Sequence, residues 1–228
     1  MFYPFFFDYT FLLLIPALIL ALYAQSKVSG TYAELSRRRA RAGLTGKEVA
    51  QLLIQNLGLR IRVEEIPGTL NDHYDPRHEV LRLSRSVARG SSVADYGVAA
   101  HEVGHALQKR EAYVAFSLRS ALVPVASFGS QLALPLFFIG FLFYIPTLMD
   151  IGIMFFSAAV LFQLITLPVE YDASRRAYAL LTQAGIVTED EKSLVKKMLN
   201  AAALTYVAAT AVAALQLLRL FLLRESRD

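Results

Sequence analysis

The sequence contains no cysteine and no tryptophan, and charged residues occupy only 18% of its 228 positions. Without cysteine, neither a disulfide framework nor a cysteine-based zinc site can form. Soluble domains are nearer a quarter charged, whereas 55% of this chain is apolar. The apolar residues are concentrated in blocks, which is typical of a protein that crosses a membrane.

A net charge of +4 is compatible with a nucleic-acid partner. Lysine and arginine also collect on the cytoplasmic side of membrane proteins, and this interpretation suits the apolar composition better. We therefore expect the lipid bilayer as a partner and no nucleic acid. No oligomeric state follows from the sequence.

Four apolar blocks are long enough to cross a hydrocarbon core, which takes roughly 20 helical residues. The first block has no basic residue ahead of it, since the first one is Lys27, so it is interpreted as an anchor and not as a cleaved signal peptide. The second and third blocks are separated only by residues 147–150, which predicts a tight antiparallel pair. The blocks cover about residues 2–23, 122–146, 151–169 and 201–223.

The predicted organisation alternates membrane spans with polar segments. The two polar segments contain fourteen and five lysines or arginines, whereas the N-terminus ahead of the first span and the turn at 147–150 contain none. Because basic residues favour the cytoplasm, both polar segments are expected there and both termini outside. The predicted segments are 1–23 (first span), 24–114 (larger polar segment), 115–169 (second and third spans), 170–200 (charged helical segment) and 201–228 (fourth span and tail).

Local signals predict helices and strands within the segment 24–114. Thr45 and Glu48 form a capping box that opens one helix. Ser92 and Asp95 open a second helix, which runs to about Arg110. Alternating and β-prone residues predict three short strands between these helices, over residues 60–65, 70–74 and 79–84.

The second of these helices contains His101-Glu102-Val-Gly-His105, which fits the pattern H-E-x-x-H. Histidines at i and i+4 lie on one helix face, so both imidazoles can bind one zinc ion. Zinc acidifies a bound water, and Glu102 can accept its proton and later give it to the departing amine. A chance match is the alternative, but the motif uses two of only four histidines and lies in a capped helix with charged flanks. We predict one zinc ion per chain, with Glu102 as general base.

The third ligand must be a carboxylate, because no histidine follows His105. Glu111 is excluded because it lies on the same helix as the histidines and points elsewhere. Asp150, Glu225 and Asp228 are excluded because they are expected on the opposite side of the membrane. The acids at 189–191 are explained by helix capping. Glu170 and Asp172 remain, at the cytoplasmic end of the third span, where a charge is costly without a role. Glu170 is the predicted ligand.

Three stretches resemble the bacterial YugP-type neutral zinc metallopeptidases: HEVGHALQ at 101–108, LPVEYDASRRA at 167–177 and NDHYDPR at 71–77. That family is similar to the gluzincin membrane proteases, including HtpX and the CAAX prenyl proteases. The resemblance covers nearly the whole chain. It implies an α-helical integral membrane protein of about four transmembrane helices with a small cytoplasmic α+β zincin-like part. The expected protein is a multi-pass zinc endopeptidase of the bacterial cytoplasmic (inner) membrane, which cleaves peptides or membrane proteins at the cytoplasmic face.

The resemblance also implies roles for single residues. A glutamate on a later helix is the third ligand in the relatives, and it maps onto Glu170. The relatives usually place an aspartate four residues after this glutamate, where it holds a ligand histidine. Here Ser174 occupies that position and Asp172 is the nearest acid, so the residue that holds the histidine is left open between the two. In this fold class a strand beside the metal helix binds the peptide, so His73 or Tyr74 is a candidate for polarising the scissile carbonyl. A hydrogen-bonded turn is the equally weighted alternative.

Two other functions compete with an endopeptidase. A catalytically silent zinc-binding membrane scaffold or assembly factor would not need Glu102, and structural zinc sites prefer four protein ligands. An intramembrane protease would carry the motif inside the bilayer, but Asp95, Lys109, Arg110 and Glu111 flank it too closely. The endopeptidase is therefore the preferred interpretation.

Overall fold

The computed structural model describes residues 9–226, which fold as two compact units. Each unit is assembled from separate parts of the chain, because the long helices pass from one unit into the other. The helical unit contains residues up to 25, 117–168 and those from 205, and the mixed unit contains 26–116 and 169–204.

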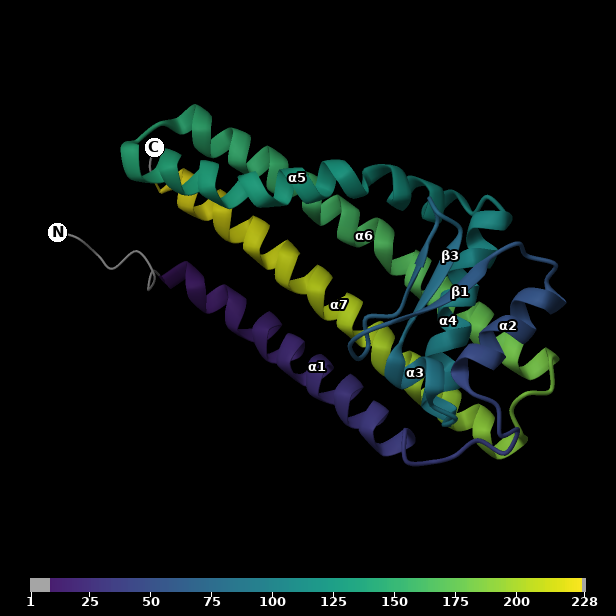
Figure 1. Cartoon of the computed structure of the whole chain (residues 1–228). Coiled ribbons are helices and arrows are strands. Elements are labelled where there is room, and N and C mark those ends of the chain that lie inside the picture. The colour runs from purple at the N-terminus through teal and green to yellow at the C-terminus, as the bar shows by residue number, and fades with distance from the viewer. Residues whose placement is uncertain (1–8, 227–228) are drawn as a thin grey trace. The chain divides into compact units, whose positions relative to one another are not determined.

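Long apolar helices dominate the fold (Figure 1). Among residues 9–226, four helical stretches are long and apolar enough to cross a membrane. Large apolar side chains stay exposed on them, such as Leu22 (72%) and Phe128 (64%), which suits contact with lipid and not with water. The stretches are η1 (Tyr9–Leu14) with α1 (Ile15–Leu35), α5 (Val114–Phe143), α6 (Pro146–Gln183) and α7 (Glu189–Glu225).

The helix boundaries differ from the predicted spans. The predicted turn at 147–150 is wrong: the connection lies at Tyr144 and Ile145, because Pro146 takes the first position of α6, where its missing N–H costs no hydrogen bond. Helix α1 continues to Leu35, well past the end of the predicted span at residue 23; no proline lies between these positions, and Gly30 does not end the helix. Residues 2–8 of the predicted first span and Asp228 lie outside the described residues.

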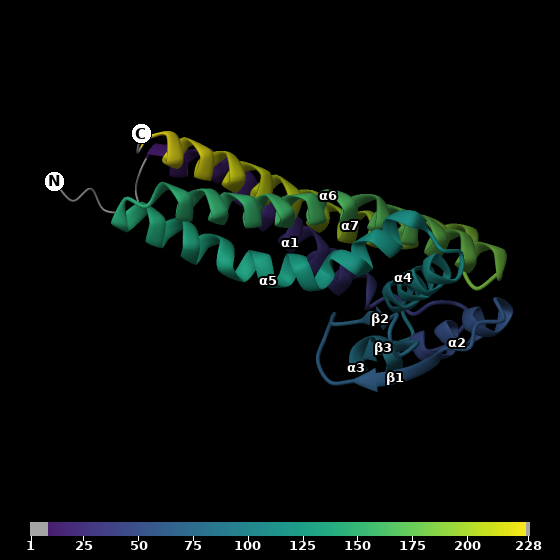
Figure 2. The same cartoon turned by 90° about the horizontal axis from the view of Figure 1, so that it is seen from above.

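The mixed unit contains a small sheet and three shorter helices (Figure 2). The strand order is β1-β3-β2; β1 and β3 are parallel, and β2 and β3 are antiparallel, with Tyr74 opposite Leu81. All three predicted strands are therefore present, within a residue or two at most ends. The elements are α2 (Gly46–Asn56), β1 (Arg62–Ile66), β2 (His73–Asp75), β3 (Val80–Ser84), α3 (Arg85–Arg89) and α4 (Val93–Arg110).

Helix α4 is the central element of the mixed unit. Both predicted capping boxes are present, at Thr45 for α2 and at Ser92 for α4. Tyr96 and Val103 of α4 are fully buried in the main core, together with Leu81 and Leu83 of β3 and Leu181 of α6. This packing fixes α4 against both the sheet and the end of α6.

Candidate metal centre

Both predicted histidine ligands project from one face of α4. The ring centroids of His101 and His105 lie 4.8 Å apart, with the ring planes at 87°. The helix is capped by Ser92 and buried along its length. The two rings are therefore carried on a rigid support and face the same region.

Helix α6 brings a carboxylate to both rings. Oε2 of Glu170 lies 3.1 Å from Nε2 of His101 and 3.5 Å from Nε2 of His105. Glu170 is only 1% exposed, and a carboxylate buried to that degree is costly unless positive charge lies beside it. The three ligand atoms lie within 4.8 Å of one another. Two imidazole nitrogens and one carboxylate oxygen are ligands that zinc accepts with a fourth position open, so these residues fit a zinc ion.

The close approach of α4 and α6 depends on Gly104, which lies between the two histidines. A Cβ atom at this position would be 2.6 Å from the backbone oxygen of Ala173. Real side chains do not tolerate such a distance, so a larger residue would force the two helices apart. The glycine therefore lets the histidines of α4 reach the glutamate of α6.

Glu102 is buried beside the ligands, and its carboxylate is held from the sheet. The backbone N–H of Tyr74 in β2 donates a hydrogen bond of 2.9 Å to Oε2 of Glu102. Burial raises the pKa of Glu102 to about 7; the neighbouring His101 opposes the shift and Glu170 adds to it. A carboxyl group that titrates near neutrality can accept a proton and return it, as general acid–base chemistry requires.

Two further side chains bond the outer nitrogens of the rings. Oγ of Ser174 lies 3.2 Å from Nδ1 of His101, and Oε1 of Gln108 lies 2.9 Å from Nδ1 of His105. Asp172 instead accepts a hydrogen bond of 2.9 Å from Nε2 of Gln108. The sequence left open whether Ser174 or Asp172 is the hydrogen-bonding partner of a ligand histidine. Ser174 contacts His101 directly, whereas Asp172 is linked to His105 only through Gln108.

The cluster Asp72-His73-Tyr74 lies at the start of β2, and its side chains point in different directions. Asp72 accepts hydrogen bonds from the backbone and the hydroxyl of Ser84. His73 is exposed, and its ring contacts a nearby backbone oxygen. The other ring nitrogen of His73 faces the guanidinium of Arg82 in β3, and His73 is not part of the group that could hold a metal ion. The side chain of Tyr74 packs in an apolar cluster with Ala106, Phe116 and Val169.

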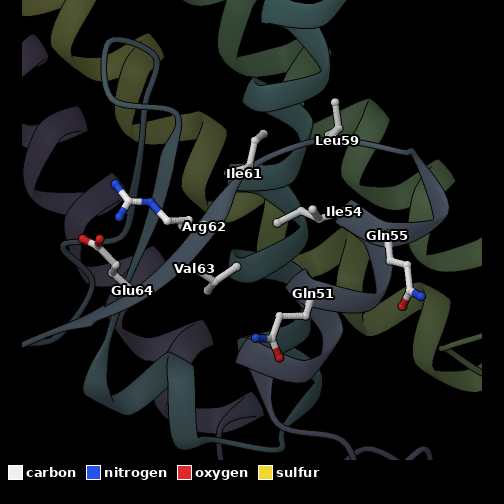
Figure 3. A pocket seen from close by; sticks show the side chains of 8 residues that line it. All are labelled: Gln51, Ile54, Gln55, Leu59, Ile61, Arg62, Val63 and Glu64. Carbon is white, nitrogen blue, oxygen red and sulfur yellow. The ribbon is translucent and has the colours of Figure 1, made fainter.

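A groove of about 660 Å³ lies elsewhere in the mixed unit, between α2 and β1 (Figure 3). Four of the eight lining residues are aliphatic and four are polar or charged, and none belongs to the metal group. Strand β1 is the edge of the sheet opposite β2, and Leu59 and Ile61 of the lining pack against the apolar cluster that contains Tyr74. The groove therefore contributes no residue to the candidate metal group.

The sequence matches, over residues 10–225, the family described as "Putative neutral zinc metallopeptidase". The chain belongs to this family. The chain is also 47% identical over 208 residues to "Putative membrane protease YugP" of Bacillus subtilis (strain 168), covering 91% of this chain and 92% of that protein. No solved structure matches the chain. The YugP-type resemblance, first suggested by three short motifs, is confirmed.

Membership in the neutral zinc metallopeptidase family agrees with the ligand set found here. Within residues 9–226, one group of histidines and carboxylates has the geometry to hold a metal ion, and it consists of His101, His105 and Glu170. The sequence analysis missed two residues at this site, Gly104 and Gln108. Gln108 follows His105 by three positions, which places it on the same helix face and could have identified it as a partner of that histidine. Gly104 is the small residue inside the motif, which could have indicated a close helix contact.

Proposed function

We propose that this chain is a membrane-anchored zinc endopeptidase of the H-E-x-x-H, gluzincin-like type. Its site is proposed to lie at the cytoplasmic face of a bacterial inner membrane, where it hydrolyses peptides or membrane proteins. The observation that carries the proposal is the meeting of two Nε2 atoms and one carboxylate oxygen at a single place, with the buried Glu102 beside them. His101, His105 and Glu170 would hold the metal.

The chain's own residues supply the proton transfers. When bound, zinc lowers the pKa of a water molecule and polarises the carbonyl of the scissile bond. Glu102 takes the proton of the attacking water and passes it to the departing amine. The N–H of Tyr74 keeps one carboxylate oxygen in place, so that the other is left to face the substrate.

A zinc-binding scaffold is the competing function. A scaffold needs the ligands but not a proton acceptor, and a structural zinc ion usually has four protein ligands. The described group offers three, and a buried carboxyl group with a pKa raised to about 7 lies next to them. Both observations favour hydrolysis.

Glu102→Gln tests the proposal directly, because glutamine keeps the size of the side chain but cannot accept the proton. The variant is expected to bind zinc like the wild type and to lose hydrolysis by about 10²–10⁴-fold. His101→Ala should lose both zinc and hydrolysis. The measurements are the zinc content of the purified full chain and cleavage of an unfolded protein and of a detergent-solubilised membrane protein. Wild-type turnover in Glu102→Gln would refute the mechanism, and an inactive but zinc-loaded wild type would favour the scaffold.

A further inference from the structure

Gln108 is a fully buried polar side chain that links the two helices of the site. It is 0% exposed, and its amide makes three hydrogen bonds. Oε1 lies 2.9 Å from Nδ1 of His105. Nε2 donates to the backbone oxygen of Val169 at 2.8 Å and to Oδ2 of Asp172 at 2.9 Å. Every polar atom of the amide therefore has a defined partner.

These partners allow only one orientation of the amide. The oxygen of Val169 is a carbonyl and can only accept. Arg175 and Arg176 both donate to Asp172, which keeps that carboxylate ionised and also confines it to accepting. The NH₂ group of Gln108 must face these two acceptors, because a flipped amide would set oxygen against oxygen. The amide oxygen must then face His105.

The orientation of the amide decides where His105 carries its proton. An amide oxygen only accepts, so Nδ1 of His105 must be the donor. A neutral ring with its proton on Nδ1 has a free lone pair on Nε2, the atom directed at Oε2 of Glu170. The bond made by one ring nitrogen thus determines what the other nitrogen can bind.

We propose that Gln108 is a positioning residue, which Val169 and Asp172 orient so that it holds the proton of His105 on Nδ1 and leaves Nε2 ready for a metal ion. The inference rests on the proposed function and extends it. His101 differs, because its partner Ser174 is a hydroxyl, which can donate or accept and so imposes no tautomer. The control of protonation is therefore assigned to the His105 side of the site.

Two substitutions separate this role from a purely structural one. Gln108→Met keeps the length of the side chain and removes the acceptor and the donors. Gln108→Glu keeps an oxygen acceptor for His105 but sets a carboxylate against Val169 and Asp172. If Gln108 acts through His105, zinc affinity falls from wild type to Gln108→Glu to Gln108→Met, the last by about 10–100-fold. If it only ties α4 to α6, Gln108→Glu is the more damaging change.

Zinc affinity is measured on the full chain by competition with a chromophoric chelator. Gln55→Met is the matched control, because Gln55 is an exposed residue of α2 beside the distant groove (Figure 3); wild-type affinity is expected. The proposal is overturned if Gln108→Met binds zinc like the wild type, if Gln108→Glu is the weaker binder, or if Gln55→Met loses as much affinity as Gln108→Met.

A second measurement needs neither a folded variant at Gln108 nor bound zinc. The chain has only four histidines, so nitrogen-15 labelling of histidine gives few NMR signals, and comparison with His105→Ala assigns those of His105. At a pH where the ring is neutral, a proton on Nδ1 and none on Nε2 is expected in the metal-free wild type, and a neutral ring protonated on Nε2 would overturn the proposal. A wild type that binds no zinc would defeat the proposed function, and this signal would still decide the role of Gln108.

Discussion

Single atoms determine what the centre can bind. His101 and His105 both direct Nε2 at the same oxygen of Glu170, and their Nδ1 atoms bond Ser174 and Gln108. In each ring, Nε2 is therefore directed at Glu170, and Nδ1 is fixed by a hydrogen bond to a neighbouring side chain. In such an arrangement the ligand side chains lose little conformational entropy when a metal ion binds, because they are already in place.

Glu170→Ala is expected to remove most of the zinc, since two imidazoles alone bind a metal ion far more weakly than three ligands. The loss of affinity should exceed the about 10–100-fold that removal of a hydrogen-bonding partner costs. Glu189→Ala is the control, because Glu189 is an exposed acid at the start of α7 that pairs with Lys192 and not with a residue of the metal group. Metal analysis after dialysis measures both. Full occupancy in Glu170→Ala would move the third ligand elsewhere.

The sequence was most informative where the relation between residues is local. The i, i+4 spacing of His101 and His105 follows from helix geometry alone. Glu170 could be selected only by excluding other acids, because its distance to the histidines depends on how α4 packs on α6. The contacts of Gln108 and the exposure of His73 depend on the tertiary structure in the same way, and no local pattern gives them.

At the scale of elements, the site depends on two helices that pack unusually closely. Gly104 on α4 faces the backbone of Ala173 on α6, between the positions that carry the ligands. Capping boxes and strand alternation were predictable because they are set by neighbouring residues. The turn before α6 was misplaced because the apolar pattern does not mark a helix end, whereas Pro146 does.

Gly104→Ala is expected to destabilise the protein by about 1–3 kcal/mol, as overpacking does, and to weaken zinc binding by moving the histidines away from Glu170. Gly97→Ala is the control on the same helix, because its added Cβ would meet Met198 only at 3.8 Å, an ordinary contact. That change should stabilise α4 by about 0.5–1 kcal/mol. Thermal unfolding and zinc competition measure the two effects. Equal behaviour of the two variants would contradict the role of Gly104.

At the scale of the whole molecule, the apolar blocks and the charged segments belong to the same long helices. Helix α6 runs from Pro146 to Gln183 and α7 from Glu189 to Glu225, so each contains both a predicted span and part of a predicted polar segment. The number of long apolar helices was predictable from composition, since a span must be apolar over about 20 residues. The extension of these helices beyond the apolar spans was harder to predict, because hydropathy marks where a helix leaves lipid and not where the helix ends.

Single cysteines test which side of the membrane the polar segments occupy, and the chain has no native cysteine to interfere. Fourteen and five basic residues lie in the segments 24–114 and 170–200, and basic residues favour the cytoplasm. Ser91→Cys and Gln183→Cys should therefore resist an impermeant thiol reagent added to intact cells and react after permeabilisation.

Tyr144→Cys is the opposing probe in this experiment. Tyr144 is 69% exposed and lies in the short connection between α5 and α6, which has no basic residue and is expected outside. It should react in intact cells, which shows that the reagent reaches the membrane. Labelling at Ser91→Cys and Gln183→Cys with protection at Tyr144→Cys would reverse the topology. The proposed site, which shares a unit with Ser91 and Gln183, would then act outside the cytoplasm.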